Sequence, residues 1–443
     1  MLGTSDCGTP SGVPETLGFA LAPKPPAAAR AHATLAAELA AFKEFGAATR
    51  RLKTAALGQP SVMVPTFVNE FWTAKQRAAN SLHEISYRAC FKPQLPRFFI
   101  QRLTKPGDVV YDPFMGRGTT LVEAALLGRV PFGNDVNPLS ITLTRPRLSP
   151  PSLTEITARL QEIDFTATGE QPRELLVFYH PQTLAEISAL RKYLLDRRAA
   201  GQLDSVDEWI GMVALNRLTG HSPGLFSVYT MPPNQAVSVK SQRKINRVRK
   251  QKPPRRDVPK LILAKSKKLL KDVNAALRRT IRKVAPRARF STAMADAAAT
   301  LPRASVALVV TSPPFLDIVD YAADNWLRCW FLGIDSQAVN ITVPKKIAVW
   351  QEIMTNVLRD VQRVLKPGGH VAFEVGEVKR GKVKLEEAVI ACGLAAGLQP
   401  LLVMINDQEF TKTANCWGVN NNAKGTNTNR IVVFQKKARK VKS

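Results

Sequence analysis

Short apolar segments that alternate with helical stretches constrain the fold more than any other feature of the chain. Residues 108–112 form such a segment, bounded by Pro106-Gly107 and by a glycine-rich turn, as a buried parallel strand would be. The same reasoning predicts further strands over 130–134, 290–294, 305–310, 369–375 and 430–435, and helices over 31–57, 119–127, 350–365 and 385–394. Strands that alternate with helices predict an α/β fold with a doubly wound, mostly parallel sheet.

Residues 150–285 interrupt this alternation and suggest the domain organisation. They contain long helical patterns, an aromatic and proline-rich loop and then a basic run, which predict an inserted, mainly helical domain. We expect residues 31–149 and 286–437 to form the catalytic domain around this insertion. Residues 1–30, rich in Ala, Pro, Gly and Thr, are expected to be a flexible leader, and residues 438–443 a basic tail.

The charge of the chain favours a polyanionic partner. The 443 residues include 63 Lys and Arg against 35 Asp and Glu, a net charge of +28. Residues 240–289 alone hold 10 Lys and 10 Arg against Asp257 and Asp272, which leaves a net +18 there and +10 elsewhere. Such a segment repels itself unless an anion compensates it, so nucleic acid is the expected partner rather than solvent alone. The predicted phosphate contacts, on a helix whose other face packs, are Lys265, Lys268, Lys271, Arg278 and Arg282.

Composition also limits the location of the protein. Hydrophobic content of 45% and charged content of 22% are typical of a soluble globular protein, and no run of 18 or more apolar residues predicts a membrane span. The N-terminus shows no secretory pattern. The five cysteines are scattered without C-x-x-C spacing, so reduced thiols and no metal site are expected. We therefore expect a cytoplasmic, nucleoid-associated protein.

The turn after the strand at 108–112 has the features of a nucleotide-binding loop. It reads DPFMGRGTT over residues 112–120, in which Gly116 and Gly118 permit a tight turn close to a ligand. Asp135 follows Gly116 by 19 residues, at the end of the second strand, where a carboxylate can accept hydrogen bonds from both ribose hydroxyls. Asp296, after a later strand, is placed to reach the exocyclic amine of an adenine moiety.

Two simpler interpretations of these residues are a glycine turn with a capping aspartate and, for Asp296, a helix cap. The combination of loop and acidic residues favours a nucleotide-like cofactor instead. The G-x-G-x-x-G pattern of dehydrogenases and the Gly-Lys-Ser/Thr ending of phosphate-binding loops are both absent from this loop.

A second motif, TSPPF, occupies residues 311–315 at the end of an apolar strand. Ligand chemistry in open α/β sheets takes place at that edge. The Ser312 hydroxyl and the Pro313 carbonyl can each accept a hydrogen bond from an exocyclic amine, and this localises the nitrogen lone pair for attack on a methyl group. Pro313 and Pro314 stiffen the backbone, and Phe315 can stack on a base rotated out of a duplex.

Together the two motifs resemble those of the cytosine-N4 and adenine-N6 DNA amino-methyltransferases, typically D-P-F-x-G-x-G-T-T and (S/N/D)-P-P-(Y/F). FKP at 91–93 is similar to the K-P segment beside the cofactor methionine, and VLKPGG at 364–369 to a turn before the fifth strand. The resemblance covers about residues 83–148 and 290–436, and it departs at Arg117, where a small residue is usual. It implies S-adenosyl-L-methionine as cofactor, a catalytic set of Ser312, Pro313, Pro314 and Phe315, and a cofactor set of Lys92, Pro93, Asp112, Phe114, Gly116, Gly118, Thr119, Asp135 and Asp296.

The resemblance also bears on the substrate. Serine at the first catalytic position is, in that family, more often seen with cytosine-N4 methylation, whereas Asp or Asn is commoner with adenine. We therefore expect a site-specific methyltransferase that acts on cytosine N4 in double-stranded DNA through base flipping, with adenine N6 as the alternative. A cytosine-C5 mechanism is disfavoured because no cysteine follows a proline. An RNA amino-methyltransferase and a catalytically silent nucleic-acid-binding protein stay open, and a cognate restriction endonuclease is a candidate partner.

Two polar loops are candidates for contacts with DNA. Residues 216–235 are dense in side chains that reach base edges or stack on bases, and they fit a well-packed structural loop equally well. Residues 415–429 are expected to lie near the flipped base or, as the simpler interpretation, to form a plain hairpin loop.

Overall fold

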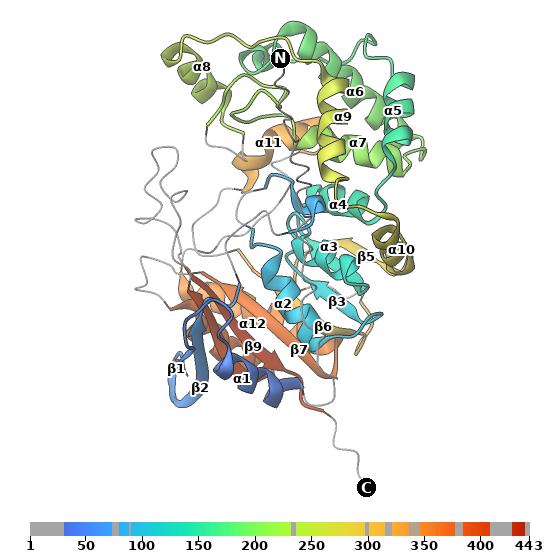
Figure 1. Ribbon diagram of the computed structural model, residues 1–443. Helices are drawn as coiled ribbons and strands as arrows, with labels where there is room; N and C mark the ends of the chain where they lie inside the picture. Colours follow the sequence, from blue (N-terminus) through green and yellow to red (C-terminus); the bar gives the residue numbers. More distant parts are fainter. Residues whose placement is uncertain are drawn as a thin grey trace, which may run out of the picture.

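The computed structural model describes residues 31–72, 79–87, 90–231, 236–296, 301–314, 321–335, 339, 344, 346–376, 384–407 and 428–438. In these ranges the chain forms one large sheet with helices against it, and a group of helices stands above one end of the sheet (Figure 1). The edge between the two parts receives the loops that carry the sequence motifs.

Within the described ranges the sheet has nine strands, in the order β1-β2-β8-β9-β7-β6-β3-β4-β5. β3 pairs in parallel with β4 and β6, β4 with β5, β6 with β7, and β2 with β8. β9 is antiparallel to both of its neighbours, and β1 to β2. This arrangement confirms the predicted doubly wound, mostly parallel sheet. The strands are β1 (Arg50–Ala56), β2 (Gln59–Asn69), β3 (Val109–Asp112), β4 (Val130–Asp135), β5 (Arg289–Thr292), β6 (Val306–Thr311), β7 (Leu365–Val375), β8 (Gln399–Asp407) and β9 (Thr428–Gln435).

The strand order creates a switch point between β3 and β6. From β3 the chain moves outward to β4 and β5, and it then returns to place β6 on the other side of β3. The loops after β3 and β6 therefore leave the sheet in opposite directions, and a crevice opens between them. In open α/β sheets such a crevice, at the carboxyl ends of the strands, is where ligands bind.

The helices fall into two groups. Those against the sheet are α1 (Ala31–Ala41), α2 (Gln94–Leu103), α3 (Thr119–Leu126), α4 (Leu139–Thr144), α10 (Ala275–Val284), α12 (Ile347–Val364) and α13 (Leu385–Ala395). Those above it are α5 (Leu153–Glu162), α6 (Pro181–Ala199), α7 (Ser205–Leu215), α8 (Val239–Val248), α9 (Val258–Leu269) and α11 (Tyr321–Leu332). α11 follows β6 in the chain, whereas the other helices of this upper group lie between β4 and β5. Arg191 Nε of α6 donates to the Trp330 carbonyl of α11 at 2.9 Å. The upper group thus draws on two separate parts of the chain.

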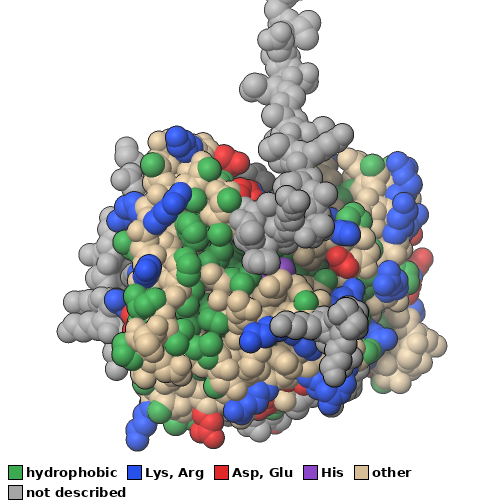
Figure 2. All heavy atoms as spheres, turned by 90° about the horizontal axis from the view of Figure 1, so that it is seen from below, with side chains coloured by type: hydrophobic (Ala, Val, Ile, Leu, Met, Phe, Trp, Pro, Cys, Tyr) green, Lys and Arg blue, Asp and Glu red, His purple; other side chains and the backbone are tan. Residues whose placement is uncertain are grey.

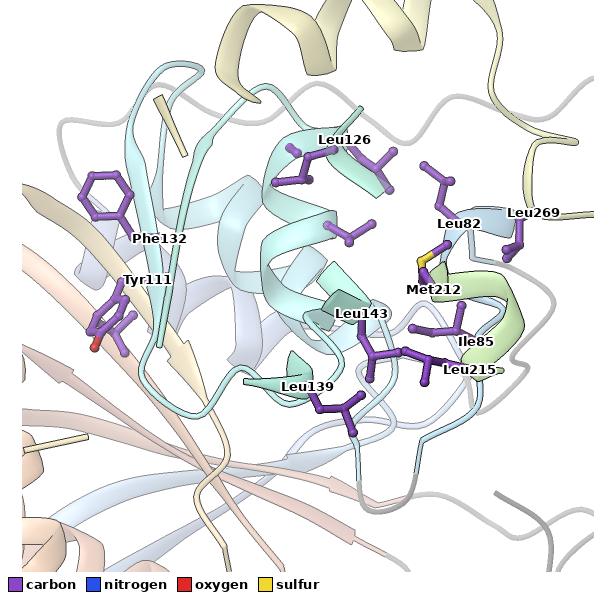
Figure 3. Packing of buried hydrophobic residues seen from close by; sticks show 14 of the residues in the cluster. Leu82, Ile85, Tyr111, Leu126, Phe132, Leu139, Leu143, Met212, Leu215 and Leu269 are labelled. Atoms are coloured by element: carbon purple, nitrogen blue, oxygen red, sulfur yellow. The ribbon is translucent and has the colours of Figure 1, made fainter. Parts of the chain in front are cut away.

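A continuous apolar core joins the two groups. Leu82 and Ile85, in and after a short 3-10 turn at Ser81–His83, are buried in the same apolar cluster as residues of α4 and α7. Figure 3 shows Leu139 and Leu143 of α4 on one side of them, with Met212 and Leu215 of α7 close by. Burial of such side chains stabilises each by about 1.5 to 3 kcal/mol, so the upper helices are fixed firmly relative to the loops beneath them.

The helix predicted over 31–57 is wrong beyond residue 41. α1 ends at Ala41, Gly46 adopts a φ of +90°, and the chain then forms β1, which pairs with β2. Leu39 and Phe42 are buried as the helical spacing predicts, but Phe45 is 43% exposed. The hairpin of β1 and β2 extends the sheet past β8, and long-range pairing of this kind overrides local helical spacing.

Candidate active site

A pocket opens at the crevice between the loops after β3 and β6. Six of the residues predicted from the sequence line it, and they come from the ends of four strands, β3 to β6. They are Phe114, Gly116, Asp135, Asp296, Ser312 and Pro314. The fold therefore brings the proposed cofactor residues and the proposed catalytic loop into one cavity.

The loop after β3 is held by Asp135, the last residue of β4. Gly116, at a φ of +48°, donates its N–H to Asp135 Oδ2 at 2.8 Å, and Asn137 N–H donates to Asp135 Oδ1 at 2.9 Å. Burial raises the pKa of Asp135, and these two donors oppose that rise. Each carboxylate oxygen keeps a second lone pair, so Asp135 can still accept hydrogen bonds from hydroxyl groups of a ligand in the pocket.

Asp112 connects the two motifs instead of lining the pocket. It is buried, and its Oδ1 accepts from Phe114 N–H at 3.0 Å and from Thr311 Oγ1 at 2.6 Å. Burial raises the pKa of Asp112 to about 7, although the hydrogen bond from Thr311 opposes that rise. The carboxyl at the end of β3 thus ties the cofactor loop to the catalytic strand β6.

Gly118 and Thr119, like Asp112, do not line the pocket. Gly118 has a φ of +74°, and a Cβ there would lie 2.2 Å from Thr144 Oγ1, so only glycine lets the loop pack against α4. Arg117 is buried and donates to the Ile85 carbonyl at 2.8 Å and to Thr119 Oγ1 at 3.1 Å. This departure from the usual motif therefore points away from the pocket and anchors the loop to residues 83–85.

Lys92 and Pro93 lie at the start of α2, with Pro93 as its N-cap residue, and neither belongs to the pocket lining. Burial lowers the pKa of Lys92. Their predicted place beside the cofactor stays a prediction.

The catalytic loop is held by side chains that sequence reasoning missed. Ser312 Oγ hydrogen-bonds Glu374 Oε2 on β7, and Asn429 Nδ2 on β9 donates to Glu374 Oε1 at 3.0 Å. Glu374 is 5% exposed, and burial raises its pKa while the hydrogen bonds from Ser312 and Asn429 oppose the rise. The signal was present in the sequence as one acidic residue within the apolar strand HVAFEV at 370–375.

The helix α12 supplies the opposite wall of the pocket. Trp350 Nε1 donates to the Pro314 carbonyl at 3.0 Å, and Ile353, Met354 and Val357 add apolar surface. Pro313 does not belong to the lining, and Phe315 lies outside the described residues.

Comparison with known proteins addresses this region of the chain. Residues 50–144 match the family model N6_N4_Mtase, described as DNA methylase. The type II methyltransferase M.MvaI of Kocuria varians is 33% identical over 97 residues, 21% of this chain and 20% of that protein. M.MjaII of Methanocaldococcus jannaschii is 39% identical over 62 residues, 14% of this chain and 12% of that protein.

Residues 50–144 are thus similar to the N4/N6 DNA methylases. The resemblance predicted from the motifs is thus confirmed for the part of the chain that includes the cofactor loop at 112–120, whereas TSPPF at 311–315 lies outside the matched residues. S-adenosyl-L-methionine is the cofactor of this family. The match spans a fifth or less of the length of each of these curated relatives.

Similar solved structures add only weak likenesses. TrmN of Thermus thermophilus is 13% identical with a TM-score of 0.32, covering 80% of this chain and 51% of that one. An S-adenosylmethionine-dependent methyltransferase of Methanosarcina mazei is 11% identical with a TM-score of 0.30, covering 77% and 98%. TM-scores this low carry no argument.

The basic run at 240–289 is not the single helix, with one packed and one basic face, that was predicted. It forms α8, α9 and α10 with breaks between them. Lys268, Lys271 and Arg282 are exposed as expected. The exposure predicted for Lys265 is wrong, because Lys265 is buried and donates to the Glu84 carbonyl. Arg278 is half-buried and donates to the Pro150 and Pro151 carbonyls.

Two further features bear on the predictions. No three His, Cys, Asp or Glu side chains of the described residues are grouped so as to hold a metal ion. Among those residues, no helix is both long and apolar enough to cross a membrane.

Proposed function

We propose that the protein is a site-specific DNA methyltransferase that transfers a methyl group from S-adenosyl-L-methionine to N4 of cytosine in double-stranded DNA. The observation that carries the proposal is the single pocket whose lining includes Ser312 together with Gly116 and Asp135. Adenine N6 is the alternative target. The match of residues 50–144 to a DNA methylase model supports DNA as the substrate. A cognate restriction endonuclease stays a candidate partner.

The residues of the cofactor loop suit a nucleoside with a charged sulfur. Asp135 would accept the ribose hydroxyls, and the exposed Asp296 would accept from the adenine amine. Phe114 and Ile353, which are partly buried, offer apolar surface to the purine. When bound, S-adenosyl-L-methionine supplies an electrophilic methyl group.

The side chains behind the catalytic loop suit amino methylation. With its proton directed at Glu374, Ser312 Oγ keeps its lone pairs free to accept an N–H from the target base. The Pro313 carbonyl would be the second acceptor, and together they localise the lone pair of the amine as it attacks. The methylated nitrogen must then lose a proton, and Ser312 can pass it to the buried Glu374 carboxylate.

Mass spectrometry of nucleosides tests this function directly. Duplex DNA is incubated with the protein and S-adenosyl-L-methionine, digested and examined for methylated bases. We expect N4-methylcytosine with wild-type protein, and roughly 10- to 1000-fold less of it after the same short incubation with Ser312→Ala. N6-methyladenine would reassign the target base, methylated RNA in a parallel reaction would reassign the substrate, and no product on any of them would reject enzymatic function.

A further inference from the structure

The helix α8 and the residues that follow it form a cationic segment without acidic neighbours in sequence. No Asp or Glu occurs between Glu208 and Asp257, whereas residues 240–252 contain seven Lys and Arg. Four of these cations lie on α8 itself and are exposed: Lys240, Arg243, Lys244 and Arg247. In the part of the chain that the structure describes, none of the four takes part in a salt bridge.

One face of α8 is docked by side-chain amides. Gln242 Nε2 donates to the Tyr229 carbonyl at 3.0 Å, and Asn246 Nδ2 donates to the Val177 carbonyl at 2.7 Å. Gln251, just beyond the helix, donates to the same Tyr229 carbonyl at 2.9 Å, and the Arg249 guanidinium lies 3.8 Å from the centre of the Tyr229 ring. Because residues four apart share a helix face, these contacts define the inner face, and the four cations fall on the opposite, outer one.

The residues just before α8 are hydrogen-bonded to α11, the helix that follows the catalytic loop in sequence. Ala236 N–H donates to the Asp324 carbonyl at 3.2 Å, and Trp326 Nε1 donates to the Val237 carbonyl at 3.3 Å. Both acceptor and donor belong to α11, which begins at Tyr321, seven residues after Pro314. The start of α8 is therefore anchored to α11, the helix that follows the catalytic loop in sequence.

The cations of α10 are placed differently. A Cβ added at Gly128 would lie 3.5 Å from Thr280 of α10, and Gly128 lies two residues before the amino end of β4 at Val130. α10 therefore lies toward the edge of the sheet opposite the pocket, and Figure 1 shows α8 and α10 on opposite sides of the molecule. On the face seen from below, Lys and Arg side chains are spread among hydrophobic and polar ones (Figure 2). The cations of α10 therefore do not lie near the pocket.

We propose that the outer face of α8 binds the phosphate backbone of the duplex whose base enters the pocket, and that the exposed cations of α10 do not. The proposal rests on the proposed function for its choice of DNA as the polyanion. A helix of ten residues is about 15 Å long, which is enough for its four cations to meet three or four successive phosphates of one strand.

Two charge-matched variants test the assignment. One changes Lys240, Arg243, Lys244 and Arg247 to Gln. The control changes four cations in and just after α10 to Gln, Arg279, Arg282, Lys283 and Arg287, so that each variant removes four positive charges from exposed positions. The affinity for one duplex is measured by fluorescence anisotropy across a series of salt concentrations. Cofactor affinity and the unfolding midpoint are measured for both, to show that the fold and the pocket are intact.

We expect the α8 variant to lower the slope of log affinity against log salt by about 2 to 4, because each lost phosphate contact contributes about 0.9. The control should lower it by less than about 1. Equal slopes for the two variants, or an unchanged slope for the α8 variant, would overturn the assignment even if wild-type protein methylates DNA. Unequal slopes without any methylated product would instead leave α8 as a DNA-binding element and reject the proposed function.

Discussion

The cofactor half of the pocket is held by residues close together in sequence, whereas the catalytic half is held by residues from distant strands. Gly116 and Asp135 are 19 residues apart and bond directly across β3 and β4. Ser312 depends on Glu374, 62 residues away, and Glu374 depends in turn on Asn429. Asp112 joins the two halves through its hydrogen bond from Thr311. Local motifs can therefore specify the first half, while the second requires the completed sheet.

The largest expected effect concerns this link and is a dependence of stability on pH. The Asp112 carboxyl has an ordinary pKa of 3.8, raised to about 7 by burial, so the folded state holds the proton more tightly than the unfolded state. Its contribution to stability is complete below about pH 4 and is lost as the pH rises to about 7, by up to about 4 kcal/mol. Asp112→Asn resembles the protonated form and should flatten this loss.

Urea unfolding at pH 5 and pH 8 measures the difference for wild type and variant. The control is Asp196→Asn, whose side chain is 61% exposed and far from the pocket in sequence. The same loss of unfolding free energy in Asp112→Asn as in wild type would show that the carboxyl is already ionised at pH 5 and that the link between the two halves is a charged one.

A second prediction concerns the catalytic half alone. Ser312→Ala should reduce the single-turnover methylation rate by roughly 10- to 1000-fold, because the lost hydrogen bond strengthens only as the amine becomes tetrahedral. Cofactor and DNA affinity should change little, since the hydroxyl contributes mainly in the transition state. Rapid quenching of a single turnover, with calorimetry of cofactor binding, separates these quantities.

Glu374→Gln distinguishes a relay from simple support of the serine. Gln can still accept a hydrogen bond from the Ser312 hydroxyl through its Oε1, but it cannot be protonated as a carboxylate can. If Glu374 is the final acceptor, the variant loses rate and also loses the rise of rate with pH that ionisation of Glu374 produces in wild type. A variant with a wild-type pH profile would reduce Glu374 to a structural role.

The contrast between the halves also explains what the sequence could predict. The strand, the glycine loop and Asp135 follow from short-range patterns, and all of them took their expected places. Glu374 was missed because its importance comes from the pairing of β6 with β7, which no local pattern encodes. The same reason accounts for the missed strands β1, β2 and β8, and for Lys265, whose burial depends on the distant Glu84 carbonyl.

The smallest expected effect concerns the cofactor half and compares its two carboxylates. Asp135→Ala should weaken S-adenosyl-L-methionine binding by about 1 to 3 kcal/mol, because the ribose loses an ionised acceptor and Gly116 loses its partner. Asp296→Asn should cost less, about 1 kcal/mol or below, because Asp296 is exposed and Asn retains an oxygen that can accept from an amine. Titration calorimetry of both variants gives the two values directly. If Asp296→Asn proved the more damaging, cofactor affinity would depend on the adenine contact, and the loop held by Asp135 would position the cofactor without contributing much to its binding.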